Sequence, residues 1–448
     1  MNRTIEARFD GYMDIESIRS RVTVRPDPVP DLETLPPMLG AELLAERLKE
    51  MYLPSQFSLS FIEEMIGLAY LHNLKVFRSE AEYAGRIFNP PDVEASPICL
   101  TGLAGVGKSQ TIAALRRAMP PPVELTCDLF EGSIELTSMW YASARGKASG
   151  KQLLLDFVHG SGHDGRGGNL AKLLVECRRR ANRDGVSTVV MDETQHINTG
   201  MGASKVTDIL LTMVAIGVPM IFVSNYSLVH KLLRRNSEDK QRLLSEPRIM
   251  LPEDPRSQDW AEYIGECMRV SGGRINSGKD EFAAELYRST FGIKRLAVQL
   301  VKLAYIECRA ASRNRIEVED LQKAYRSSAY TSSAKEVEEL QLQVINKGTH
   351  GAHLDLCCPF DLPVEFKSNV VSFNRADRDQ RVQTRVFDSS ATETERSLLR
   401  EIAKPEEKTP TKATRRKPLP VATDEELTLA FHQYMESQSP SSNLKKPR

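Results

Sequence analysis

The stretch from Ile98 to Ser109 reads ICLTGLAGVGKS, and it decides the fold. A short apolar run ends in a glycine-rich turn, and the turn leads into residues 110–117, QTIAALRR, which carry a helical pattern. A strand, such a turn and a helix form the setting of a phosphate-binding P-loop, where backbone N–H groups converge on a phosphate. The helix N-terminus adds the positive end of its dipole. The stretch therefore predicts that a nucleoside triphosphate binds here.

The side chains of this loop have separate expected roles. Lys108 would reach the β- and γ-phosphates, and the hydroxyl of Ser109 would hold Mg²⁺. The residues expected to bind the nucleotide are Gly102, Gly105, Val106, Gly107, Lys108, Ser109 and Gln110.

A second element supports the P-loop. The β-rich run VSTVVM at residues 186–191 ends in Asp192 and Glu193. An aspartate at the end of an apolar strand can hold Mg²⁺ or its water, as a Walker B residue does. Glu193 is placed to orient and deprotonate the attacking water. Alone, this pair would read as a helix N-cap after a strand, but behind a P-loop it predicts hydrolysis.

Length and composition limit what the chain can be. With 448 residues it is long for one core, so two or three domains are expected. The formal net charge is zero, so any affinity for nucleic acid must come from a local patch. The seven cysteines show no C-x-x-C spacing, which argues against a zinc site. No signal sequence or membrane-spanning apolar run is present, so we expect a soluble, cytoplasmic protein.

The order of predicted elements indicates an α/β fold, with a parallel sheet sandwiched by helices and followed by a small all-α domain. Residues 218–223 read as a buried strand, and residues 128–168 read as rich in loops. Helical spacing covers residues 170–181, 204–215, 259–268, 280–288, 294–310 and 318–325.

The chain divides into six expected parts. They are an extended N-terminal arm (1–37), a helical segment (38–95), the nucleotide-binding core (96–252), a helical lid (253–330), a C-terminal extension (331–403) and a disordered basic linker with a short partner-binding helix (404–448). The arm is either a disordered tail or a segment that docks on a partner. In the last part, Leu427, Leu429 and Phe431 form a short amphipathic pattern that would order on a partner.

These motifs together resemble the AAA+ ATPases. The resemblance rests on the adjacent Asp192 and Glu193, on Asn225 at the end of the next strand, and on the helical domain that follows. It implies ATP as the nucleotide and a sensor role for Asn225, which would read the γ-phosphate. Residues 292–297, GIKRLA, look like the start of a second sensor helix, with Arg295 as its cation and Lys294 as the alternative.

Within this class the layout looks most like the TnsC/TniB family of transposition regulators. The signature DETQHI at residues 192–197, the run ILLTMVAIGVPMI at 209–221 and the arm with Leu35-Pro36-Pro37 carry that resemblance. It implies an oligomer, a ring or a filament, that forms on duplex DNA with ATP and links a target-site selector to a transposase. Hydrolysis would dismantle it. The alternative is a helicase-loader-like or signalling P-loop ATPase that remodels a protein partner.

The resemblance also implies sites shared between subunits. Arg234 and Arg235 are the candidates for an arginine finger in trans, and Arg242 and Arg248 are weaker ones. Duplex DNA would be bound through its backbone, with little sequence preference, by the loops before Asp192. The DNA-binding candidates are Arg145, Lys147 and Lys151, with Arg166 in a second glycine-rich loop, and a solvated basic loop is the alternative.

Overall fold

The computed structural model describes residues 7–76, 79–91, 95–147, 149–160, 169–198, 202–345 and 353–390. The chain forms two compact units, Met1–Arg378 and Asp379–Arg448. Of the six expected parts, the linker and short helix at 404–448 lie outside the described residues.

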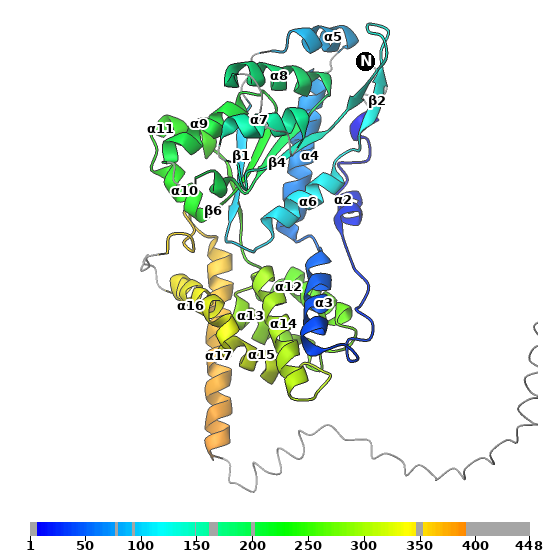
Figure 1. Cartoon of the computed structure of the whole chain (residues 1–448). Helices are drawn as coiled ribbons and strands as arrows, with labels where there is room; N and C mark the ends of the chain where they lie inside the picture. The colour runs from blue at the N-terminus through cyan, green and yellow to red at the C-terminus, as the bar shows by residue number, and fades with distance from the viewer. Residues whose placement is uncertain are drawn as a thin grey trace, which may run out of the picture. The chain divides into compact units, whose positions relative to one another are not determined.

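A parallel sheet lies at the centre of the nucleotide-binding core (Figure 1). It has five strands in the order β4-β5-β6-β1-β7. The strands are β1 Pro97–Gly102, β4 Met139–Ser143, β5 Thr188–Asp192, β6 Met220–Asn225 and β7 Pro247–Met250. Every residue of β1 and β5 is buried, as expected of parallel strands covered on both faces. A separate antiparallel hairpin is formed by β2 Val123–Thr126 and β3 Ser133–Leu136.

The two faces of the sheet pack into different hydrophobic clusters. In β6, Ile221 and Val223 join the cluster that includes helices α4 and α6, while Met220 and Phe222 join the one that includes α7 to α11. This alternation follows from the period of two in a strand. The helices around the sheet are α4 Gln56–Val76, α5 Glu80–Phe88, α6 Lys108–Ala118, α7 Gly150–His159, α8 Leu170–Arg183, η2 Thr194–Asn198, α9 Ala203–Val214, α10 Tyr226–Leu233 and α11 Ser237–Leu243.

The N-terminal arm folds onto its own core. The prediction of an extended arm is wrong at Ile15–Val22, which forms helix α2, because the side chain of Asp14 caps it by accepting a hydrogen bond from Ser17 N at 2.8 Å. The short helix η1, Ala7–Phe9, precedes it. The Arg8 guanidinium donates a 2.7 Å hydrogen bond to Gly185 O, and Phe9 is fully buried. Described residues of the arm are therefore part of the folded chain.

The lid contains the four helices that the sequence predicts. They are α12 Gln258–Val270, α13 Lys279–Thr290, α14 Lys294–Ala310 and α15 Val318–Arg326. Helix α3, Pro37–Glu50, lies against α14, as Figure 1 also shows. Upstream of α3, Arg25 forms a 2.7 Å ion pair with the buried carboxylate of Glu266, and Tyr305 donates a 2.8 Å hydrogen bond to Leu32 O. Part of the N-terminal segment thus packs with the lid.

The C-terminal extension contacts both the core and the lid. It contains α16 Thr331–Ile345 and α17 Val364–Ser390, and the short helix η3 Ser328–Tyr330 ends the lid just before it. On the core side, a ring nitrogen of His230 lies 2.9 Å from Cys357 O. On the lid side, Asn369 donates a 2.7 Å hydrogen bond to Asp254, and the ring of Phe373 lies 4.9 Å from that of Tyr287. Residues 353–378 therefore bridge α10 and the lid.

The stretch 128–168, predicted as loop-rich, contains regular structure. It holds β3, β4 and α7, and β4 is an edge strand of the main sheet. Its side chains are mostly half-buried, and its apolar run, Met139 to Ala142, is only four residues long. None of the described helices is both long and apolar enough to cross a membrane.

Candidate active site

The P-loop joins the carboxyl end of β1 to the start of α6. Its glycines are required because other parts of the chain pack closely against the loop. A Cβ on Gly102 would lie 2.3 Å from Met250 O in the neighbouring strand β7. At Gly105 the backbone has φ +87°, and a Cβ would lie 2.8 Å from Arg295 Nε. Larger residues would clash at the first position and be strained at the second. Both glycines therefore let the loop approach other elements closely.

The Lys108 ammonium lies at the centre of this loop. Its Nζ donates 2.8 Å hydrogen bonds to Gly102 O, Leu103 O and Asn225 Oδ1. Burial lowers the pKa of Lys108, the charge of Asp192 opposes this shift and that of Arg295 adds to it, and the resulting pKa is about 8. The cation is thus enclosed and already oriented by three oxygens, as a phosphate-binding lysine must be.

Asp192 and Glu193 lie at the end of β5, beside the P-loop. Asp192 is buried, and it accepts a 2.7 Å hydrogen bond from Glu193 N as well as one from the Ser109 side chain. Burial raises the pKa of Asp192, and these two hydrogen bonds oppose the rise. Glu193 has φ +54°, a left-handed conformation that is costly for this residue type and is found most often at functional sites.

The residues present fit Mg²⁺. The Ser109 hydroxyl and the Asp192 carboxylate are in contact, and both offer the oxygen ligands that this ion prefers. Within the described ranges, no group of three or more His, Cys, Asp or Glu side chains could hold a metal. A single protein carboxylate is consistent with a Mg²⁺ site that is completed by substrate phosphates and water.

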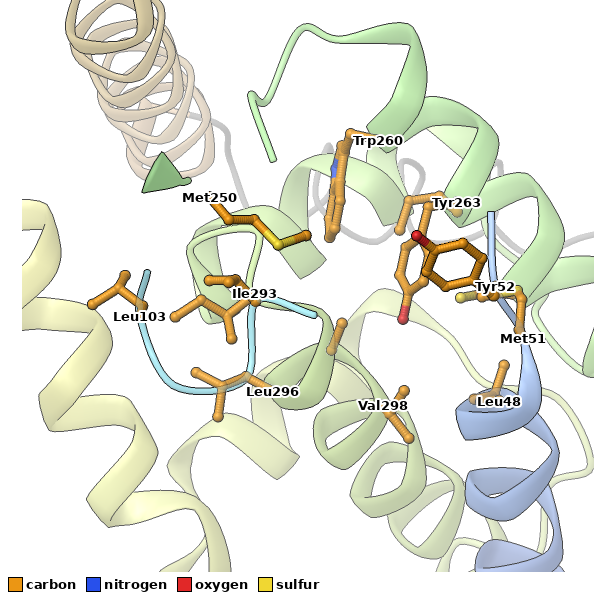
Figure 2. Close-up of a cluster of buried hydrophobic side chains, with 14 of the residues drawn as sticks. Leu48, Met51, Tyr52, Leu103, Met250, Trp260, Tyr263, Ile293, Leu296 and Val298 are labelled. Carbon is orange, nitrogen blue, oxygen red and sulfur yellow. The ribbon is translucent and has the colours of Figure 1, made fainter. Parts of the chain in front are cut away.

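A cavity of about 490 Å³ extends from the P-loop towards the lid. Besides the P-loop residues, it is lined by the apolar side chains of Leu48, Met51 and Val298 together with Tyr263. Figure 2 shows these side chains in one buried cluster. They come from the N-terminal segment and from two lid helices, so no local pattern in the sequence could identify them. Their position makes them candidates for holding the nucleotide base.

Of the two sensor candidates in the lid, Arg295 is better placed. Its backbone N donates a 3.2 Å hydrogen bond to Gly105 O, and its exposed side chain lines the cavity. Lys294 also lines the cavity, but it forms a 2.8 Å ion pair with Glu253 and lies over the ring of Tyr263. Arg295 therefore keeps its guanidinium available to a phosphate.

The arginine-finger candidates do not line this cavity. Arg234 is exposed at the end of α10, and Arg235 forms a 3.0 Å ion pair with Asp239. Arg242 lies 3.9 Å from Glu238, and Arg248 is held by carboxylates of Glu64 and Glu246. Only a site on a neighbouring subunit is compatible with a catalytic role for Arg234 or Arg235.

Three of the DNA-binding candidates follow β4. Ser143 pairs in register with Asp192, and Ala144 N donates a 2.9 Å hydrogen bond to Asp192 O. The exposed Arg145 comes next, and Lys147 forms a 2.8 Å ion pair with Asp156. The last of the three, Lys151, lies in the first turn of α7, and Arg166 lies outside the described residues. The loop after β4 is thus attached directly to the Walker B strand.

Two polar residues beside the site were missed by the sequence analysis. Burial, and next the charge of Asp192, raise the pKa of Tyr141 on β4. Gln195 lines the cavity, and its side-chain oxygen is buried without a hydrogen-bond partner in the described part of the chain. Gln195 lies in the stretch DETQHI at 192–197, where a polar side chain so close to Asp192 could have indicated a place in the site. Tyr141 had no such signal.

Comparison with known protein families decides the class of this domain. The model described as "AAA domain" matches residues 92–232, which run from before β1 into α10. These residues form an AAA domain. The predicted α/β AAA+ P-loop fold is thereby confirmed, and the chain contains an ATP-hydrolysing AAA domain. The match covers less than half of the chain, and no curated protein matches the sequence.

Several solved structures are similar to the chain around this AAA domain. The Aeropyrum pernix ORC2 protein in its ADPNP–ADP complexes has 14% identity and a TM-score of 0.42, over 66% of this chain and 77% of that chain. Drosophila ORC bound to DNA has 13% identity and a TM-score of 0.40, over 84% and 91%. The Thermotoga maritima RuvB Holliday junction branch migration motor has 12% identity and a TM-score of 0.32, over 64% of this chain and 76% of that chain. Similarity at these levels carries no information on function.

Proposed function

We propose that this chain is an AAA+ ATPase that regulates DNA transposition. In this role it assembles with ATP as a ring or filament on duplex DNA and links a target-site selector to a transposase. Hydrolysis then dismantles the assembly. The proposal is supported by the AAA domain at 92–232 and by the stretch DETQHI at 192–197, which resembles the TnsC/TniB signature.

The side chains around the cavity have the chemistry that hydrolysis needs. When bound, ATP with Mg²⁺ supplies the phosphoryl group and a counter-charge for it. Lys108 holds the phosphate oxygens, Ser109 and Asp192 hold the metal, and Glu193 takes the proton of the attacking water. Asn225, already 2.8 Å from Lys108 Nζ, and Arg295, packed on Gly105, contact the γ-phosphate.

Assembly supplies the part of the site that one subunit lacks. Arg234 and Arg235 lie at the end of α10, outside the cavity of their own subunit. We assign one of them to the γ-phosphate of a neighbouring subunit, where a positive charge stabilises the charge that develops during hydrolysis. ATP then joins subunits, and its loss separates them.

The observation that carries the DNA part of the proposal is the attachment of the Arg145 loop to Asp192. Ala144 N donates a 2.9 Å hydrogen bond to Asp192 O, and Arg145 is the next residue. A DNA phosphate bound by this loop would therefore be connected to the nucleotide site through the hydrogen bond between Ala144 and Asp192. One loop gives few phosphate contacts, and the chain has no net charge, so affinity requires many subunits along the DNA.

A gel-shift experiment on long duplex DNA tests this function. With ATP or a non-hydrolysable analogue, the chain should form a large complex whose affinity is nearly the same for unrelated sequences. ADP should not support it. The alternative, a loader-like or signalling ATPase that remodels a protein, predicts no ATP-dependent shift on DNA alone. Equal binding with ADP and ATP would contradict nucleotide-controlled assembly.

A further inference from the structure

A short stretch of the C-terminal extension, residues 353–377, crosses from the core to the lid, and we call it the strap. Its first half contacts α10, the helix that begins directly after the sensor candidate Asn225. There a ring nitrogen of His230 lies 2.9 Å from Cys357 O, and Cys357 is buried. Phe360 packs against the hydrophobic cluster that includes α7 to α11. This end of the strap is therefore fixed to the core.

The second half of the strap, at the start of α17, holds the segment that joins the core to the lid. That segment lies between β7 and α12. Asn369 donates a 2.7 Å hydrogen bond to the carboxylate of Asp254. Arg256 donates a 2.8 Å hydrogen bond to the Ser372 hydroxyl. Since hinges between moving parts are commonly such short connecting segments, the strap binds residues that would change conformation if the lid moved.

The strap also reaches the body of the lid, at the end of α13. The ring of Phe373 lies 4.9 Å from that of Tyr287, edge to face. Beside it, Arg288 donates a 2.8 Å hydrogen bond to Asp377. Val370, between the contacts with the hinge and those with α13, is fully buried. This end of the strap is therefore fixed to the lid.

A cavity of about 220 Å³ lies where the strap meets the core and the lid. Its lining includes Leu103 of the P-loop, Tyr226 next to Asn225, and Phe291, which precedes the second sensor helix. These three residues and Phe366 of the strap belong to one hydrophobic cluster. A displacement of any of the three elements would therefore change how the strap is packed.

We infer that the strap restrains the opening of the lid and so controls how fast nucleotide leaves. The nucleotide cavity is lined by the P-loop and by Tyr263, Arg295 and Val298 of the lid, so a bound nucleotide would be enclosed between core and lid. Its release requires the two to separate, and lid opening is a common slow step in enzymes. Because the strap is anchored on both, opening must break the contacts at one anchor. The inference rests on the nucleotide site, and it does not depend on the proposed role on DNA.

The test is the rate at which a fluorescent ADP analogue dissociates from the full chain, without DNA, after excess unlabelled ADP is added. His230→Ala breaks the core anchor. The double change Asn369→Ala, Phe373→Ala breaks the lid anchor, and a third variant carries all three changes. Arg375→Ala is the matched control, because Arg375 is an exposed residue in the same part of α17.

We expect the lid-anchor variant to release the analogue about tenfold faster, since a hydrogen bond and a ring contact are lost, and His230→Ala about threefold faster. The triple variant should release it no faster than the lid-anchor variant, because a connection that is broken at one end restrains nothing. Arg375→Ala should match the unchanged chain.

Unchanged or slower release in either anchor variant would overturn the inference. Release about 30-fold faster in the triple variant would overturn it too, since effects that multiply indicate two independent local defects rather than one connection. If the unchanged chain does not bind the analogue, the nucleotide site itself is wrong, and the inference falls with it.

Discussion

Lys108 Nζ lies 2.8 Å from Asn225 Oδ1, so the P-loop and the end of β6 meet in one hydrogen bond. The two residues are 117 positions apart in the sequence. Strands β1 and β6 are neighbours, with Gly102 in register with Asn225, and this pairing brings the amide to the ammonium. A γ-phosphate that displaces Asn225 from Lys108 would therefore be sensed at the first turn of α10.

Lys108→Ala and Asn225→Ala should separate binding from hydrolysis. Lys108→Ala removes the main cation for the phosphates, so ATP affinity should fall by at least about 100-fold, which corresponds to about 2.7 kcal/mol. Asn225→Ala should leave affinity within about threefold but reduce turnover about 10- to 100-fold. Nucleotide titration and phosphate release measure the two effects. Lys205→Ala, an exposed lysine on α9, is the control, and wild-type ATP affinity in Lys108→Ala would refute the P-loop assignment.

Glu193→Gln should hold ATP without cleaving it. The amide keeps the size of the side chain but cannot accept the proton of the attacking water, so turnover should fall by about 10²- to 10⁴-fold. Affinity for ATP should stay within a few fold, because Lys108, Ser109 and Asp192 are unchanged. Single-turnover hydrolysis and analogue binding are the measurements. Normal hydrolysis by this variant would mean that another residue is the base.

Replacing Arg145, Lys147 and Lys151 together by Ala should weaken DNA binding equally for all sequences and flatten its salt dependence. Among the single changes, Arg145→Ala should have a larger effect than Lys147→Ala, because Lys147 is paired with Asp156. Affinity for ATP should not change. Lys323→Ala, an exposed lysine of the lid, serves as the control. If the triple variant binds DNA as well as the unchanged chain does, the DNA-binding surface lies in another part of the chain.

His72 should make the folded chain sensitive to acid. Burial lowers its pKa to about 4 from an ordinary 6.5, and the charges of Lys75 and Arg86 add to the shift. Between these values the unfolded chain binds the proton and the folded chain does not, so stability falls as the pH drops from 6.5 towards 4. The loss can reach about 3 kcal/mol. Urea unfolding at pH 7 and pH 5 should show a smaller loss for His72→Gln than for the exposed control His353→Gln.

Truncation at Lys404 should leave ATP hydrolysis and DNA assembly intact while abolishing recruitment of the transposase and transposition. Residues 404–448 carry the basic linker and the apolar residues Leu427, Leu429 and Phe431, which we propose order on a partner. A pull-down with the transposase compares the truncated chain with a full-length Leu427→Ala, Phe431→Ala variant, which should fail in the same way. Full transposition by the truncated chain would place the partner surface elsewhere.

The candidate site residues could be proposed from the sequence because their expected chemistry requires fixed residue types at fixed positions along a strand or turn. Asp192 and Asn225 each end an apolar strand and Lys108 follows one, and the carboxyl ends of neighbouring parallel strands lie together. Helix α14 could be predicted in full, Lys294–Ala310, because its apolar spacing is regular and Gly292 precedes it with φ +69°. These features depend on short segments of sequence.

Other features depend on contacts between distant segments, and the sequence does not encode them locally. Strand β4 lies at the edge of the sheet with half-buried side chains, and its apolar run of four residues, Met139 to Ala142, is too short to identify a strand by itself. The apolar part of the cavity lining combines Leu48, Tyr263 and Val298 from three helices. The arm could not be assigned to its own core, because the decisive contact of Arg8 is with Gly185, 177 residues away.

The lifetime of the DNA-bound assembly tests the central claim most directly, namely that ATP builds it and hydrolysis dismantles it. Complexes on long labelled duplex DNA are formed with ATP or with a non-hydrolysable analogue, and their decay is followed after free protein is removed. Complexes of the unchanged chain with ATP should decay at about the rate of hydrolysis, while those with the analogue, and those of Glu193→Gln with ATP, should persist at least about tenfold longer. Equal lifetimes in all three cases would contradict the account.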